Sequence, residues 1–170
     1  NAAYTIKLLN KLLNLMLSNE SLIRFAQSLG SDCAFFVKNK PQIAYEKGDI
    51  TRDIKLTLKG YYLLLIVPDI QINTKKAYQG VIPQKPHHSI EEIIKEPLSH
   101  WKEVLNNDFE SSIFQNFPII KEIKQELYHA GAEYASLSGS GSAIYGIFKA
   151  PPPKISFPQR YMVWQEKMEF

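Results

Sequence analysis

The sequence predicts an α+β fold with a mostly antiparallel sheet. Short β-rich runs are bounded by Gly, Pro or Ser, and apolar residues recur at helical spacing between these runs. From residue 60 onward the order is strand, helices, strand, strand and a final strand, which is typical of the α+β class. The 170 residues are 45% hydrophobic, enough for one ordinary domain or two small ones with a buried core.

The first part of the chain is expected to hold helices and a hairpin but too few strands for a sheet of its own. Helical spacing of apolar residues and capping residues predict the helices, and two β-rich runs around a glycine predict the hairpin. The expected elements are a helix with apolar residues from Ile6 to Leu17, a helix capped by Ser18 or Asn19 and ended by Gly30, a short element in 31–38, and a hairpin in 42–58 around Gly48.

The second part is expected to supply the sheet. The run "YYLLLIVP" at 61–68 is apolar throughout, which predicts a strand covered on both faces. The elements expected after it are a short helix capped by Asn73 or Thr74, a helix over 89–105 with a Ser89–Glu92 capping box and a kink or break at Pro97, and a helix over 112–130. Two strands around a glycine turn in 132–148, a proline-rich connector and a last strand in 161–168 are expected to follow.

Composition excludes several classes of protein. A net charge of +3 is too weak to indicate a nucleic-acid partner, and one cysteine, Cys33, excludes a disulfide framework within the chain. The longest apolar run is too short to cross a membrane, so we expect no membrane partner and a cytoplasmic location. The adjacent His87 and His88 have no further ligand at metal-binding spacing, and no metal site is predicted.

The stretch "LGSDCAFF" places Asp32 after a glycine that ends a helix and at the start of a new element. The spacing alone favours an aspartate that caps the following helix. The alternative is a carboxylate that accepts a hydroxyl proton at an active site.

The stretch "SLSGSGSA" joins two predicted strands. It is either a flexible hairpin turn or a loop whose backbone N–H groups approach an anion, with Gly139 and Gly141 leaving room for the ligand. It lacks the Gly-Lys-Ser/Thr ending of a Walker loop.

The stretch "NTKKAY" places Thr74 near a helix start and Tyr78 one turn later on the same face. Taken alone, the two are a capping residue and a half-buried ring. A hydroxyl donor and a stacking surface for a flat ligand, such as a nucleobase, are the functional alternative.

Together, Asn-Ala-Ala leading a helix, "LGSDCAFF", a hairpin with Gly48-Asp49, "NTKKAY" and "LSGSGSAIYGIF" resemble the GHMP kinase superfamily over most of the chain. Ala34, Glu46 and Ser142 differ from residues common in that family. The resemblance implies the C-terminal part of a two-domain kinase. Residues 1–58 would be the remainder of an S5-like ATP-binding and catalytic domain, and residues 59–170 a ferredoxin-like α/β sandwich that binds substrate.

The resemblance also implies an activity and roles for individual residues. The implied reaction is ATP-dependent phosphorylation of the 2-hydroxyl of a cytidine-diphosphate-linked methylerythritol, in isoprenoid precursor synthesis by the non-mevalonate pathway. Mg²⁺ would enter as Mg–ATP, and the protein would be a monomer or homodimer. The roles implied are a catalytic base for Asp32, ATP binding for Asn1, Gly139, Ser140 and Gly141, and substrate binding for Thr74 and Tyr78.

In this family a Gly-Gly-Gly-Ser-Ser-Asn-Ala-Ala loop binds the ATP phosphates, and Asn1-Ala2-Ala3 matches its end. We therefore expect a chain cut within that loop, inactive as a kinase when alone. A mevalonate-type or homoserine-type kinase is the alternative enzyme. A non-catalytic ferredoxin-like binding module is the alternative of another class, although no strand carries the paired aromatic residues of an RNA-binding motif.

Overall fold

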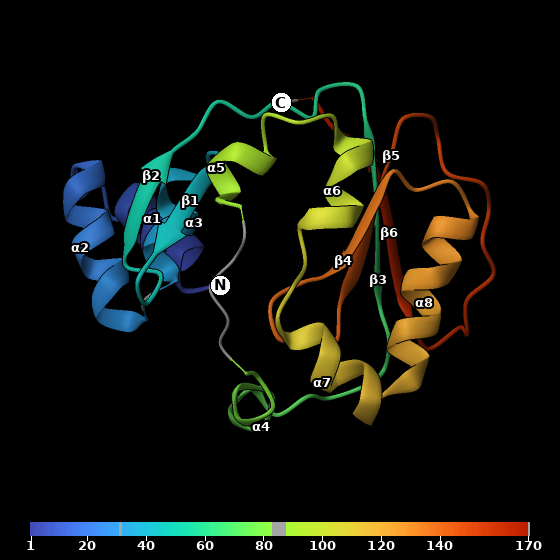
Figure 1. Cartoon of the computed structure of the whole chain (residues 1–170). Helices are drawn as coiled ribbons and strands as arrows, with labels where there is room; N and C mark the ends of the chain where they lie inside the picture. The colour runs from blue at the N-terminus through green and yellow to red at the C-terminus, as the bar shows by residue number, and fades with distance from the viewer. Residues whose placement is uncertain (31, 83–87, 170) are drawn as a thin grey trace. The chain divides into compact units, whose positions relative to one another are not determined.

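A computed structural model describes residues 1–30, 32–82 and 88–169. The chain divides into two compact units, Asn1–Leu56 and Thr57–Phe170, each with its own hydrophobic core. Figure 1 shows the helices and strands of each unit. Mixed helices and an antiparallel sheet confirm the α+β class.

The first unit consists of three helices and a two-stranded antiparallel hairpin. The Ser18 side chain accepts a hydrogen bond from the Ser21 N–H and so caps the second helix, as expected. The core of this unit joins residues from all three helices: Ala3, Leu22, Ala26 and Val37. The elements are α1 (Ala2–Leu12), α2 (Asn19–Leu29), α3 (Cys33–Lys38), β1 (Gln42–Tyr45) and β2 (Ile50–Asp53).

The apolar spacing that runs on to Leu17 does not continue the first helix. Helix α1 ends at Leu12, because the Asn10 side chain bonds both the N–H and the C=O of Leu17 and holds the chain in a turn. Side-chain bonds of this kind compete with helical ones. Leu17 still packs on the core of the unit, so its apolar character reflects tertiary packing.

The second unit contains a four-stranded antiparallel sheet of order β4-β5-β3-β6. Three of its helices, α4, α7 and α8, contribute to its main core. Its elements are β3 (Tyr62–Val67), α4 (Thr74–Gln79), α5 (Ile90–Ile93), α6 (Leu98–Val104), α7 (Phe109–Asn116), α8 (Pro118–His129), β4 (Tyr134–Leu137), β5 (Ile144–Phe148) and β6 (Met162–Lys167).

One face of this sheet carries most of the core. Leu64 and Ile66 of β3 are buried against Ile120 and Leu127 of α8, whereas Leu63 on the opposite face is only half-buried. Leu63 shares its face with Ile147 and Tyr134, which are both buried, and the Tyr134 ring packs against Trp101 of α6. The expectation that β3 is covered on both faces is therefore confirmed, with deeper burial of β3 on the side of α8.

Two prolines divide the predicted helices. The break expected at Pro97 is present, because α5 ends at Ile93 and α6 begins at Leu98. The single helix expected over 112–130 is wrong, since Pro118 starts a separate helix, α8, at the first-turn position where proline is tolerated.

The connector between β5 and β6 departs from the ferredoxin-like βαββαβ pattern, in which a helix occupies this place. Residues 149–161 are all described and contain no helix. Four prolines, at 151, 152, 153 and 158, disfavour one. Ile155 and Phe157 pack against the core instead, so the connector supplies apolar side chains that the missing helix would have supplied.

Within the described ranges, no helix has both the length and the apolar character needed to cross a bilayer.

Candidate functional site

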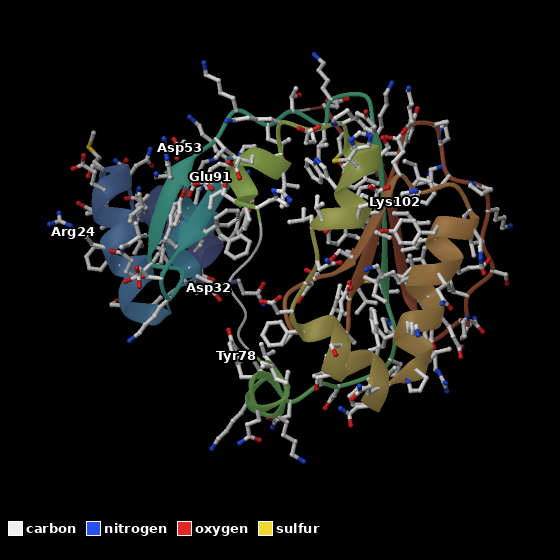
Figure 2. All side chains as sticks on the ribbon, in the orientation of Figure 1. Arg24, Asp32, Asp53, Tyr78, Glu91 and Lys102 are labelled. Carbon is white, nitrogen blue, oxygen red and sulfur yellow. The ribbon has the colours of Figure 1, made fainter. Side chains whose placement is uncertain are left out.

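Tyr78 presents an aromatic ring at the surface of α4. Asn73 begins this helix by accepting a hydrogen bond from the Lys76 N–H, so Thr74 is its first residue and Tyr78 lies one turn later. Tyr78 is 66% exposed, and the centroid of its ring lies 4.9 Å from that of Phe109, with the two rings nearly perpendicular at 89°. Phe109 holds the ring from one side and leaves area for a flat ligand. Figure 2 labels Tyr78 on its helix.

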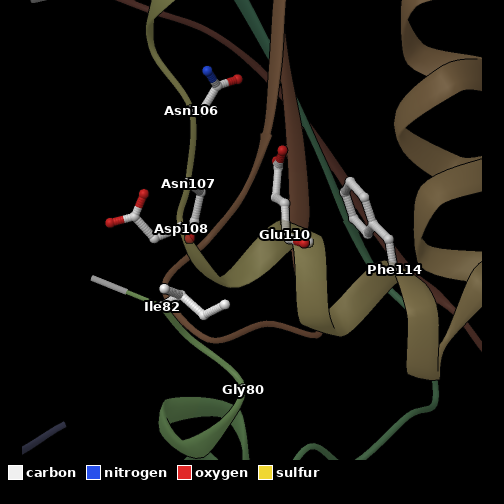
Figure 3. Close-up of a pocket in the computed structure, with 8 residues that line it drawn as sticks. Gly80, Ile82, Asn106, Asn107, Asp108, Glu110 and Phe114 are labelled. Carbon is white, nitrogen blue, oxygen red and sulfur yellow. The ribbon is translucent and has the colours of Figure 1, made fainter. Parts of the chain in front are cut away.

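Gly80 allows α4 to lie close to α7. A Cβ at Gly80 would overlap the Ser112 side chain of α7, so a larger residue would push the two helices apart. Beside this contact is a pocket of about 450 Å³, shown in Figure 3. Its lining comes from the end of α4, the segment before α7 and α7 itself: Gly80, Ile82, Asn106, Asn107, Asp108, Glu110, Ser111 and Phe114.

The glycine turn between β4 and β5 uses its two glycines differently. Gly139 has φ +56°, and nothing lies within 4 Å of where its Cβ would stand. Gly141 has φ +85°, and a Cβ there would meet the methyl groups of Ile72 and Leu137 at 3.0 Å. The Gly141 N–H donates to the Ser138 carbonyl within the turn. The open space that an anion would need is therefore at Gly139, whereas packing requires glycine at 141.

Asn107 and Glu110, which the sequence analysis did not identify, hold this turn in place. The Asn107 Nδ2 donates to the carbonyl oxygens of Leu137 and Gly139, both at 2.8 Å. The Glu110 carboxylate is 8% exposed and accepts from the Leu137 N–H at 3.0 Å. The only sequence signal was a pair of polar residues beside a predicted helix start, and their partners lie about 30 residues further along.

The same segment, 107–110, links the glycine turn to the Tyr78 ring. Asn107 bonds the turn, while Phe109, two residues later, supports the ring. The Asn107 Oδ1 also accepts from the Phe109 N–H at 2.9 Å. The structure therefore brings Tyr78 and the turn containing Gly139 to one short segment of the second unit.

Asp32, in the first unit, occupies the N-cap position of α3, but its side chain makes no capping hydrogen bond. The capping role that the spacing favours is thus absent. One carboxylate oxygen instead approaches Gly48 in the turn between β1 and β2, where a Cβ would lie 2.6 Å from Oδ1. Gly48 has φ +87°, so the turn and the carboxylate both favour glycine at this position. Figure 2 labels Asp32.

Asn1 lies at the exposed start of α1, and its side chain makes no capping bond. Its carbonyl accepts from the Thr5 N–H at 3.0 Å. Two side chains of α1 bond the end of α3: the Tyr4 hydroxyl donates to the side chain of Asn39, which caps α3, and the Lys7 amine donates to the Val37 carbonyl. None of these contacts involves Asn1 or Asp32.

Three tyrosines, of which Tyr134 is buried and Tyr128 and Tyr145 are half-buried, belong to the sheet or lie against its edge. Burial, the largest cause in each case, raises the pKa of Tyr128, Tyr134 and Tyr145 above the ordinary value of 10.0. The Tyr134 hydroxyl donates to the Leu105 carbonyl. These hydroxyls are therefore structural groups that stay protonated at neutral pH.

Among residues 1–30, 32–82 and 88–169, no group of three His, Cys, Asp or Glu side chains is arranged to hold a metal ion. His87, one of the two histidines considered above, lies outside the described residues.

Comparison with known proteins finds similarity to kinases. Residues 89–156 match the family model described as "GHMP kinases C terminal". The chain is 49% identical over 156 residues to a 4-diphosphocytidyl-2-C-methyl-D-erythritol kinase from Bacteroides fragilis, a match that covers 92% of this chain and 57% of that protein. It is 50% identical over 149 residues to the protein of the same name from Bacteroides thetaiotaomicron, covering 88% of this chain and 54% of that one.

Solved structures show the same likeness. A crystal structure of 4-(cytidine 5'-diphospho)-2C-methyl-D-erythritol kinase matches with a TM-score of 0.73 and 25% identity, over 88% of this chain and 55% of that one. Homoserine kinase from Cytophaga hutchinsonii matches with a TM-score of 0.60 and 14% identity, over 94% and 61%, which shows a shared fold. The chain spans just over half the length of the curated relatives it matches.

Proposed function

We propose that this chain, whose residues 89–156 carry the C-terminal domain of the GHMP kinases, belongs to an ATP-dependent small-molecule kinase. The proposed substrate is 4-diphosphocytidyl-2-C-methyl-D-erythritol, and the proposed reaction transfers the ATP γ-phosphate to its 2-hydroxyl in the non-mevalonate route to isoprenoid precursors. Similarity to kinases of that name along most of the chain supports the choice of substrate.

The observation that carries the proposal is the arrangement around residues 107–110. This segment supports an exposed aromatic ring at Tyr78 and a glycine turn with open space at Gly139. A ring of this kind suits a cytosine base, and backbone N–H groups beside an open glycine suit a phosphate. A kinase for a cytidine-diphosphate substrate needs both kinds of site.

In the proposed reaction Asp32 accepts the proton of the 2-hydroxyl as that oxygen attacks the γ-phosphorus. The bond between the γ-phosphorus and the bridging oxygen breaks, and ADP leaves. The roles proposed for the other residues are binding of the cytidine part for Thr74 and Tyr78, and binding of ATP for Asn1, Gly139, Ser140 and Gly141. Phosphoryl transfer of this type depends chiefly on positioning and on neutralising charge.

Mg²⁺ is part of this proposal only as the ion bound to ATP, where it neutralises the phosphate charge.

The Gly139 and Ser140 N–H groups make no protein hydrogen bond in the described part of the chain, so they fit a phosphate oxygen. The proposal includes a cytoplasmic location, because ATP is the donor, and a monomer or homodimer without nucleic-acid or membrane partners.

Replacing Tyr78 tests the proposed substrate. In the full-length protein, Tyr78→Ala is expected to raise the KM for the cytidyl substrate about 5- to 100-fold, because stacking of one base contributes about 1–3 kcal/mol. The KM for ATP should stay the same. Tyr78→Phe keeps the ring and serves as the matched control. An unchanged KM for the cytidyl substrate in Tyr78→Ala would contradict the proposed base stack.

A further inference from the structure

The outer edge of β4 is bonded by side chains. In the described sheet β4 is an edge strand, so the N–H and C=O groups of alternate residues point away from β5. The Tyr128 hydroxyl donates to the Ala135 carbonyl and accepts from the Ala135 N–H, both at 3.1 Å. Two residues later, the Leu137 N–H donates to the Glu110 carboxylate, and the Leu137 carbonyl accepts from the Asn107 side-chain amide. Three side chains thus fix the course of β4 up to the turn.

Asn107 extends this control into the turn itself. Its Nδ2 also donates to the Gly139 carbonyl at 2.8 Å, while its Oδ1 is occupied by the Phe109 N–H. With both ends of the amide bonded, its orientation is fixed. Asn107 therefore determines the direction of the Gly139 carbonyl.

The direction of the Gly139 carbonyl also determines the direction in which the Ser140 N–H points. The only cis peptide bond in the described chain is Gly141–Ser142, so the bond between Gly139 and Ser140 is trans. In a planar trans peptide the carbonyl and the following N–H point in opposite directions. Because Asn107 holds the Gly139 carbonyl toward the 107–110 segment, the Ser140 N–H points away from that segment. In the described ranges this N–H has no protein acceptor.

The hydrogen bond between Glu110 and the Leu137 N–H is a second fixed point of the turn, and it is a strong bond. Its carboxylate is buried, and each of its two oxygens has a partner: Oε1 accepts from the Leu137 N–H and from the Ser136 hydroxyl at 3.4 Å, and Oε2 from Lys124 Nζ at 2.6 Å. Lys124 neutralises the charge that burial would otherwise penalise. A hydrogen bond from a backbone N–H to a carboxylate is stronger than a neutral one.

We propose that Asn107 and Glu110 are positioning residues that orient the Ser140 N–H of the glycine turn toward an ATP phosphate. Glu110 anchors Leu137, where the turn begins, and Asn107 sets the peptide plane between Gly139 and Ser140. The inference rests on the proposed function, since it takes a phosphate of ATP as the acceptor.

The test compares nucleotide binding by variants of the full-length protein. Asn107→Asp keeps the shape of the side chain but replaces the two donated hydrogen bonds with repulsion of two carbonyls. Glu110→Gln keeps the shape and removes the charge. Asn107→Asp is expected to raise the Kd for Mg–ADP and the KM for ATP at least about tenfold, the effect of losing roughly one hydrogen bond. Glu110→Gln should act in the same direction, and neither should change the KM for the cytidyl substrate.

Asn116→Ala is the matched control, because the Asn116 side-chain amide donates to the Ser112 carbonyl of α7 and, among the described residues, makes no hydrogen bond with the turn. It should bind Mg–ADP as the parent protein does. If Asn107→Asp does not fold, Asn107→Ser, which keeps one hydroxyl donor, takes its place. A loss of stability alone would change the KM for ATP and the KM for the cytidyl substrate together, or change neither. Loss of the orienting role raises only the KM for ATP.

Amide NMR of the ¹⁵N-labelled parent protein separates the two levels of the proposal. Addition of Mg–ADP should shift the Ser140 amide signal. If the parent protein binds Mg–ADP without that shift, or does not bind it, the proposed phosphate role of the turn fails. If the shift occurs and both variants bind Mg–ADP as the parent does, the positioning role of Asn107 and Glu110 is wrong while the proposed function stands.

Discussion

Replacing Gly48 by Ala tests whether the position of the Asp32 carboxylate controls the reaction. The added Cβ would lie 2.6 Å from Asp32 Oδ1. Carbon and oxygen atoms in contact are normally about 3.3 Å apart or more, so one of the two must move by roughly 0.7 Å. Oδ1 is the end of a rotatable side chain, and the Cβ is fixed to the backbone of a turn. The carboxylate is therefore the group that moves.

The size of the effect follows from two separate terms. Alanine in a left-handed conformation costs about 1–2 kcal/mol, which lowers the free energy of unfolding. A displacement of about 1 Å at a reacting group costs about 100-fold in rate, so a shift of this size is expected to reduce kcat by about 10- to 100-fold. The stability term is independent of Asp32, whereas the rate term depends on it.

Gly60→Ala supplies the matched control. Gly60 has φ +89°, against +87° for Gly48, and no atom lies within 4 Å of its Cβ position. Both variants of the full-length protein should lose similar stability in urea unfolding, but only Gly48→Ala should lose kcat. In an Asp32→Asn background, Gly48→Ala should have little further effect on kcat. Equal kcat for Gly48→Ala and Gly60→Ala would refute the reasoning.

Two further predictions concern side chains of the second unit, the second of them with a control in α1 of the first unit. In an ultraviolet titration of the folded protein, Tyr128, Tyr134 and Tyr145 should ionise above pH 10, because folding raises their pKa values. The free energy of unfolding should therefore be retained below pH 10 and fall as the pH rises above it. Ionisation of every tyrosine in a single step near pH 10 would contradict this. Leu127→Ala should lower the free energy of unfolding by about 2–5 kcal/mol, since Leu127 is 0% exposed. Leu12→Ala, at a position that is 72% exposed, should change it by no more than about 0.5 kcal/mol. Similar losses for the two variants in urea unfolding would contradict the assignment of Leu127 to the core.

Features decided by neighbouring residues could be predicted from the sequence. The caps at Ser18 and Asn73, the Ser89–Glu92 capping box and the break at Pro97 each depend on residues a few positions apart, and all are present. The end of α1 could not be predicted in this way, because Asn10 bonds Leu17 in a conformation that apolar spacing does not report. The separate helix that begins at Pro118 follows from the same proline rule as the break at Pro97 and was predictable from the sequence.

The candidate site was only partly predictable for the same reason. The glycine turn and the Tyr78 ring stand out by composition and by the family resemblance. Asn107 and Glu110 do not, because their bonds to Leu137 join residues 30 and 27 positions apart. The local spacing also favoured a capping role for Asp32, and the approach of its carboxylate to Gly48 depends on how the hairpin packs.

Phosphorus NMR of the full-length protein with Mg–ATP and one acceptor at a time tests the central claim most directly. The account predicts that 4-diphosphocytidyl-2-C-methyl-D-erythritol gains a phosphomonoester signal as ADP forms in equal amount, and that Asp32→Asn slows this about 100- to 10,000-fold. Homoserine and mevalonate should gain none. Phosphorylation of homoserine or mevalonate in preference to the cytidyl substrate, or no transfer by the folded protein, would contradict the account.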